Sequence, residues 1–126
     1  MILYLDTSAF VAALGGEAHS KSMHRVLKEH SAVASALLQI EVARATARAS
    51  ADVRALAQER LRAVRLIDID RGIVAKAAQL APEVRLRSLD AIHLATALAV
   101  PEPVAMLTLD QRLLAASLLV GVRPAL

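Results

Sequence analysis

Short apolar runs that alternate with longer helix-forming segments are the feature that most restricts the fold of this chain. The runs are rich in aliphatic and β-branched side chains and lie at residues 2–5, 32–34, 64–69 and 104–109, with a short last one at 121–123. Such short runs suit strands buried on both faces, and strands that alternate with helices form a parallel sheet. We therefore predict an α/β fold, a three-layer α/β/α sandwich around a central, mostly parallel sheet.

Helix-capping residues and helix breakers mark the segments between these runs. Asp6 and Asp70 precede two of them, Ser35 and Asp52 are candidate caps for two more, and Gly15-Gly16 follows the first. The predicted helices span residues 9–14, 19–30, 36–49, 52–63, 71 to a point before Pro82, 88–99 and 110–119.

Length and composition exclude several classes of protein. The 126 residues suit a single domain, 1–126, and the 56% hydrophobic content argues against disorder. No apolar run approaches the roughly 18 residues of a membrane helix, and Asp6 stands where the apolar part of a signal peptide would begin. With no cysteine, disulfides, thiolate zinc sites and cysteine nucleophiles are excluded. We expect a cytoplasmic domain.

The excess of positive charge is concentrated in one arginine-rich segment of the chain. The net charge is +3, and residues 41–65 hold six arginines against three acids, so this segment carries the whole excess. Arginine suits phosphate recognition, and Arg44 and Arg48 are candidates for RNA binding. The alternative is a solvated helix face with internal ion pairs. Aromatic residues are only 2% of the chain, which argues against a base-stacking surface.

Two aspartates follow apolar runs at opposite ends of the chain. Asp6 follows residues 2–5, and Asp110 follows residues 104–109. In a parallel sheet the ligand crevice lies beyond the carboxyl ends of the strands, so both side chains are expected at the same edge. The alternative for each is helix capping, because each opens a predicted helix.

Two further carboxylates lie on predicted helices with apolar faces. A glutamate on such a face, here Glu41, costs several kcal/mol unless it is paired or binds a metal. The alternative for Glu41 is a salt bridge to Arg44 or Arg48, and the alternative for Asp90 is a first-turn contact with the helix dipole worth about 0.3–1 kcal/mol. His93 is expected to be a core residue hydrogen-bonded to a carbonyl rather than a metal ligand.

If these four carboxylates converge, they repel one another and need cations. Oxygen ligands without cysteine or a compelling histidine favour Mg²⁺ or Mn²⁺. Beside a basic surface, such ions suit phosphodiester hydrolysis, in which one metal activates water and a second, about 3.5–4 Å away, stabilises the leaving oxygen.

Four segments carry a resemblance to a known family. Residues 1–10 resemble the opening strand and turn of a PIN domain, residues 35–42 resemble its acidic helix, and residues 89–98 and 107–116 resemble its third and fourth acidic motifs. Their order and spacing, over residues 1 to about 122, are similar to the toxin ribonucleases of VapBC toxin–antitoxin modules. Residues 50–87 carry no signature of the family.

The resemblance implies a PIN-like fold and a Mg²⁺- or Mn²⁺-dependent endoribonuclease. It implies a homodimer that is inhibited by a VapB-like antitoxin, whose C-terminal segment crosses the active-site groove. It also implies that the catalytic and metal-binding acids are Asp6, Glu41, Asp90 and Asp110. Ser8 and Thr108 match supporting hydroxyls, and Arg112 matches a basic or polar position with a candidate role in RNA binding.

Two other functions remain as alternatives. An aspartyl phosphoryl-transfer domain also places an aspartate after its first strand, but it needs a second acid beside it and a lysine after a later strand. Here Thr7 and Ser8 follow Asp6, and the lysines are Lys21, Lys28 and Lys76. A non-catalytic binding or regulatory module would not need all four acids.

Overall fold

The structure is a computed structural model that describes residues 1–15, 18–80, 82–83 and 85–125. The strands are β1 Ile2–Leu5, β2 Ser31–Ser35, β3 Val64–Ile67, β4 Val104–Leu107 and β5 Arg123–Pro124. The helices are α1 Thr7–Ala12, α2 Ala18–Glu29, α3 Leu37–Ala45, α4 Ala51–Leu61, α5 Arg71–Ala78, α6 Ser88–Ala99 and α7 Gln111–Leu119. None of these described helices is long and apolar enough to cross a membrane.

The strands form one sheet in the order β3-β2-β1-β4-β5, and every neighbouring pair is parallel. The chain winds from the central strand β1 to β2 and β3 on one side, and then returns to place β4 and β5 on the other. In such sheets the crevice for a ligand lies where the winding reverses, beyond the carboxyl ends of the strands. Here that position is between β1 and β4.

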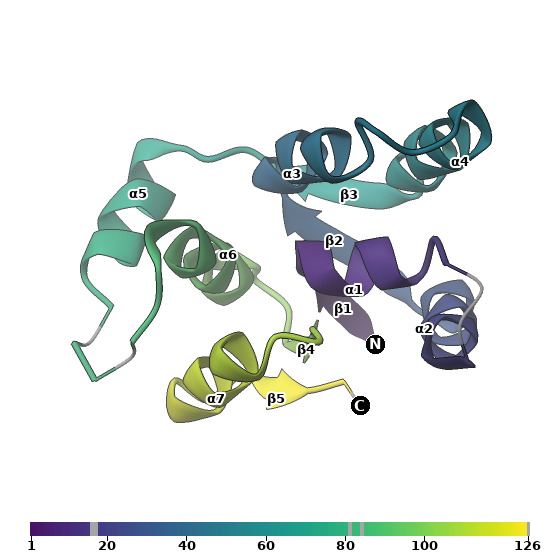
Figure 1. The fold of residues 1–126 in the computed structure, drawn as a ribbon. Helices are drawn as coiled ribbons and strands as arrows, with labels where there is room; N and C mark the ends of the chain where they lie inside the picture. The colour runs from purple at the N-terminus through teal and green to yellow at the C-terminus, as the bar shows by residue number, and fades with distance from the viewer. Residues whose placement is uncertain (16–17, 81, 84, 126) are drawn as a thin grey trace.

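Two apolar cores, one on each face of the sheet, produce the predicted three layers. Successive strand residues face opposite sides, so Leu3 and Leu5 enter one core and Tyr4 enters the other. The first core also contains buried residues of α1, α3 and α4, and the second contains buried residues of α6 and α7. In Figure 1, α5, α6 and α7 lie to the left of the strands, whereas α2 and α4 lie to their right. The three-layer prediction is confirmed, and the sheet is entirely parallel.

The helices α3 and α4 differ from their predicted bounds. The helix predicted over 36–49 is shorter, because α3 ends at Ala45 and Thr46 donates its hydroxyl to the Val42 carbonyl at 2.8 Å. The predicted cap Asp52 is wrong, because Ser50 accepts the Val53 N–H and caps α4, which leaves Asp52 in the first turn. Ser35 precedes the N-cap position of α3, although its hydroxyl still accepts the Leu37 N–H at 3.1 Å.

The first helix lies two residues earlier than predicted, because α1 begins directly after its cap Asp6 and ends at Ala12. Gly15 follows a turn beyond its end, and Gly16 of the predicted Gly15-Gly16 stop lies outside the described residues.

The strands predicted over 64–69 and 104–109 are each two residues shorter. β4 ends at Leu107 because this residue pairs with Leu5, the last residue of β1. Asp110 therefore does not end a strand, although it caps α7 as predicted. The last strand begins at Arg123 rather than 121, because Gly121 adopts a φ of 85° that ends the preceding turn.

Candidate active site

Asp6 is the most deeply buried of the predicted acids, with 5% of its surface exposed. Its Oδ1 accepts the Ala9 N–H at 3.1 Å and so caps α1. Thr108 donates its hydroxyl to Oδ2 at 2.6 Å, and Ser8 donates to the same carboxylate at 2.8 Å. The register of β1 and β4 explains why Asp6 and Thr108 lie side by side. Leu5 pairs with Leu107, and Asp6 and Thr108 are the residues that directly follow this pair.

The environment of Asp6 disfavours its ionised form. Burial raises the pKa of the Asp6 carboxyl above its usual 3.8, and the hydrogen bonds from Thr108, Ala9 and Ser8, with the charge of His93, offset only part of this effect. Within the described part of the chain, no lysine or arginine forms an ion pair with Asp6. A cation bound at Asp6 would neutralise the buried negative charge of its carboxylate.

The two predicted hydroxyls connect Asp6 to the turn that carries Asp110. The Asp110 N–H donates to Thr108 Oγ1 at 2.9 Å, and the Leu109 N–H donates to Ser8 Oγ at 2.9 Å. Asp110 itself accepts the Arg112 N–H at 2.9 Å, which fixes the start of α7. The structure therefore brings the first and fourth predicted acids to one edge of the sheet.

Replacing Thr108 by valine should weaken the fold through this network. The Asp6 carboxylate loses its shortest donor and the Asp110 N–H loses its acceptor, which costs about 1–3 kcal/mol of unfolding free energy. Urea denaturation measures the loss, and the matched Thr108→Ser variant, which keeps the hydroxyl, should lose much less. Equal losses in the two variants would show that the methyl group, not the hydroxyl, supports the site.

Glu41 lies on α3 with its side chain 23% exposed. Its Oε1 accepts the Thr7 hydroxyl at 2.6 Å and contacts His93 Nε2 at 2.7 Å. Burial raises the pKa of Glu41, but the hydrogen bonds from His93 and Thr7, with the charge of His93, outweigh it and hold the pKa below its usual value of 4.5. The proposed salt bridge to Arg44 or Arg48 is wrong, because Glu41 pairs with His93 instead.

His93 lies in the core as expected, but with other hydrogen-bond partners than expected. It is 2% exposed, and its two ring nitrogens contact Glu41 and the Tyr4 hydroxyl, the latter at 2.8 Å. The expected carbonyl partner is therefore wrong. The available signal was the position of His93 one turn after Asp90 on α6, and thus on the same helical face as a predicted site residue.

Asp90 occupies the first turn of α6 and is 18% exposed. Its Oδ2 lies 3.4 Å from Nε of Arg87, a side chain that is 77% exposed. In the described part of the chain, no three or more His, Cys, Asp or Glu side chains lie together in a way that could hold one metal ion. The convergence of all four acids around a metal thus stays a prediction.

The predicted RNA-binding arginines are accessible. Arg44 and Arg48 are exposed and line a shallow hollow at the end of α3, on the helix that carries Glu41. Arg112 is exposed on α7 and lines another hollow with Arg85 and Glu83.

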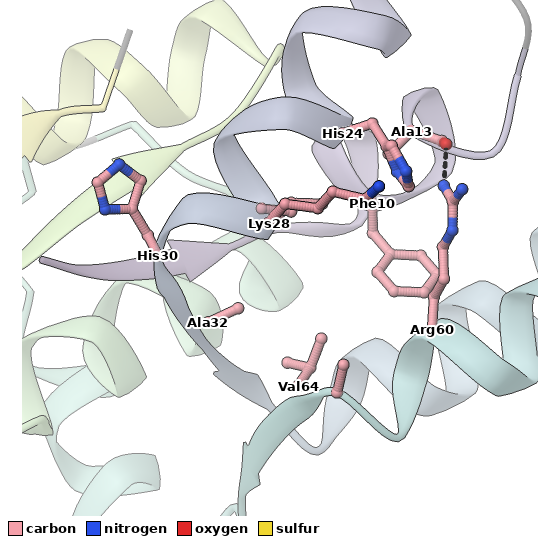
Figure 2. A pocket seen from close by; sticks show the side chains of 10 residues that line it. Phe10, Ala13, His24, Lys28, His30, Ala32, Arg60 and Val64 are labelled. Atoms are coloured by element: carbon pink, nitrogen blue, oxygen red, sulfur yellow. Dashed lines mark hydrogen bonds between the residues drawn. The ribbon is translucent and has the colours of Figure 1, made fainter.

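A separate pocket of about 160 Å³ lies near the amino ends of β2 and β3, away from the carboxyl ends where Asp6 follows β1. Its walls include Phe10 and Val64, and its rim carries His24, Lys28 and Arg60 (Figure 2). Arg60 donates to the Ala13 carbonyl, and its charge, with desolvation and Lys28, lowers the pKa of His24. No carboxylate is among the described lining residues, so this pocket does not suit a divalent cation.

Comparison with known proteins agrees with this geometry. The family described as "PIN domain" matches residues 3–117. Ribonuclease VapC46 of Mycobacterium tuberculosis is 38% identical over 96 residues, which span 75% of this chain and 73% of the relative. Ribonuclease VapC35 of the same species is 36% identical over 124 residues, spanning 89% and 87% respectively.

A solved structure shows the same fold. A chain of the "Toxin-antitoxin complex from Klebsiella pneumoniae" superposes with a TM-score of 0.70 over 86% of each chain, at 20% sequence identity. At this identity the likeness concerns the fold alone.

Proposed function

Because this chain belongs to the PIN-domain family, and within it to the VapC ribonucleases, we propose that it is a divalent-metal-dependent endoribonuclease and the toxin of a toxin–antitoxin pair. The observation that carries the proposal is the buried Asp6 carboxylate, whose charge no described lysine or arginine balances. It lies where the winding of the sheet reverses, the position at which α/β proteins bind ligands.

The residues fit a hard divalent cation by their chemistry. They offer carboxylate and hydroxyl oxygens, and the raised pKa of Asp6 reflects a buried charge that lacks compensation. In the proposal Asp6 and Asp90 hold Mg²⁺ or Mn²⁺ directly, and Glu41 and Asp110 hold it directly or through water. The bound cation would supply an activated water and charge stabilisation at the phosphate.

The chain's own residues prepare the site. Thr108 and Ser8 hold the Asp6 carboxylate in one orientation through their hydroxyls. Arg44 and Arg48, and on the other side Arg112, are free to contact phosphates that flank the cleaved bond.

We also propose an antitoxin partner. The support is the Klebsiella pneumoniae chain of the same fold, which was solved in a toxin–antitoxin complex. A VapB-like segment that crosses the acidic edge would block both the carboxylates and the flanking arginines. A homodimer, expected from the family resemblance, remains part of this proposal, and the exposed Leu118 and Leu119 of α7 are available to such a contact.

Replacing Asp90 by asparagine should remove cleavage and leave the fold intact. The exposed Arg87 contributes little to stability through its pair with Asp90, about 0.2–1 kcal/mol at most. Several kcal/mol of transition-state stabilisation depend on a metal ligand, so the rate should fall about 100-fold or more. Cleavage of a total RNA preparation with Mn²⁺ measures the effect.

The matched control for this variant is Asp70→Asn. Asp70 is an exposed aspartate that caps α5, and asparagine also caps helices well. This variant should cleave RNA at the wild-type rate. Wild-type activity in Asp90→Asn, or activity that survives excess EDTA, would refute the metal-dependent mechanism.

A further inference from the structure

A buried chain of hydrogen bonds leads from the sheet to Glu41. The Ser35 N–H donates to the Tyr4 hydroxyl at 3.1 Å, and this hydroxyl lies 2.8 Å from His93 Nδ1. The His93 Nε2 is 2.7 Å from Glu41 Oε1. The rings of Tyr4 and His93 meet edge to face, with centroids 5.9 Å apart. Both rings are almost fully buried, so the imidazole has little freedom to turn.

The direction of the last hydrogen bond follows from the contacts on either side of it. The Tyr4 hydroxyl accepts the Ser35 N–H and has its own proton to donate to His93 Nδ1, and Glu41 Oε1 already accepts the Thr7 hydroxyl. The proton of this contact therefore belongs to His93 Nε2, which donates to Oε1. The other nitrogen, held by Tyr4, fixes the plane in which the donor points.

The two carboxylate oxygens of Glu41 have different surroundings. Oε1 accepts from both His93 and Thr7. Oε2 accepts no hydrogen bond from the described residues, and no described buried side-chain oxygen lacks a partner, so Oε2 is accessible. One oxygen is thus bound to the protein and the other is open to a ligand.

We propose that His93 is a positioning residue: held by Tyr4, it fixes one oxygen of Glu41 against the protein and leaves the other to bind a divalent cation. The inference rests on the proposed function, which places Glu41 among the metal-binding acids. Hydrogen-bond partners of metal ligands typically change metal affinity or activity 10- to 100-fold when they are removed. His93 acts through Glu41 and needs no contact with RNA.

A double-mutant cycle between His93 and Glu41 tests this role. The four proteins are wild type, His93→Asn, Glu41→Gln and the double variant, and Mn²⁺ alone is the probe. The loss of the free Mn²⁺ signal in electron paramagnetic resonance reports binding without RNA. His93→Asn should weaken Mn²⁺ binding about 10- to 100-fold when Glu41 is present and leave it unchanged in the Glu41→Gln background. An equal loss in both backgrounds, or no loss in either, overturns the proposal.

Two substitutions at His93 separate positioning from packing. Glutamine is long enough to place an amide N–H near the position of Nε2, whereas asparagine is too short to reach Glu41. His93→Gln should therefore keep Mn²⁺ affinity near the wild-type value, while both variants lose a similar amount of thermal stability. Losses of affinity that simply follow the losses of stability would contradict the positioning role.

A second variant covers the case in which His93→Asn does not fold. Tyr4→Phe keeps the ring but releases His93 Nδ1 and the Ser35 N–H. It should weaken Mn²⁺ binding several-fold, and unchanged affinity in Tyr4→Phe would overturn the proposal.

RNA cleavage by the wild-type protein is measured in parallel. If the wild type binds Mn²⁺ and cleaves no RNA, the proposed function fails while the coupling of His93 to Glu41 is still measured. If the wild type cleaves RNA and the coupling is absent, only the role of His93 fails. A wild type that binds no Mn²⁺ refutes both.

Discussion

Replacement of Asp6 by asparagine is expected to abolish RNA cleavage and, in metal-free buffer, to raise the melting temperature. Asparagine keeps the helix cap, because its side-chain oxygen can accept the Ala9 N–H. It removes a carboxylate whose ionised form is disfavoured by burial. Cleavage should fall about 100-fold or more, since a metal ligand is lost. Calorimetry and an RNA cleavage assay on the same preparation measure both effects.

The sign of the pH dependence provides a check on the cause. The folded pKa of Asp6 lies above its unfolded value, so its favourable contribution is complete below about pH 3.8 and is lost as the pH rises through the folded pKa. The stability advantage of Asp6→Asn over wild type should therefore grow as the pH rises from about 4 toward neutrality. Glu41, whose pKa is lowered, contributes in the opposite sense, but it is present in both proteins and cancels from the difference.

For this pair of effects the control is again Asp70→Asn, which should change neither activity nor the melting temperature appreciably. A less stable Asp6→Asn protein at neutral pH would mean that Thr108 and Ser8 depend on the charge of the carboxylate for their hydrogen bonds. Retained cleavage would mean that Asp6 only caps α1.

Addition of Mn²⁺ or Mg²⁺ should stabilise the wild-type protein strongly. A cation that binds only the folded state adds about 2.7 kcal/mol when its concentration is a hundred times its Kd. For a domain of this size, that corresponds to a rise of roughly 10 °C in the melting temperature. Thermal unfolding with increasing MnCl₂ measures the rise, and KCl at matched ionic strength controls for screening of surface charge.

The Asp6→Asn protein should lose most of this rise in melting temperature, because it lacks the most deeply buried of the proposed metal-binding carboxylates. An equal rise in both proteins would locate the stabilising cation elsewhere on the surface and would contradict the proposed site.

The architecture was largely predictable because the local signals agree with the tertiary fold. The strand at residues 2–5 and the helix at residues 88–99 have the predicted bounds. Each segment has an uninterrupted apolar pattern and is followed by a residue that ends it. The errors lie where two signals compete. At the start of α4, Ser50 and Asp52 are both good caps, and the choice depends on which backbone N–H each can reach.

The acidic edge was predictable only in outline. The rule for parallel sheets places Asp6 and Asp110 at the same edge, and the structure connects them through Thr108, which donates to Asp6 at 2.6 Å and accepts the Asp110 N–H. The partner of Glu41 was not predictable, because the two arginines near it in sequence compete with a histidine from another helix that only the tertiary fold brings close. Local charge pairing therefore gave the wrong answer, since the partner comes from 52 residues away.

The central position of β1 has a consequence for protein synthesis. β1 is synthesised well before β4, its neighbour in the sheet, and Thr108, which donates its hydroxyl to Asp6, is 102 residues further along the chain. Contacts of such long sequence separation form late, so a nascent or prematurely terminated chain that lacks β4 has no assembled acidic edge. Translation thereby delays the assembly of the acidic edge until the segment that contains β4 has been synthesised.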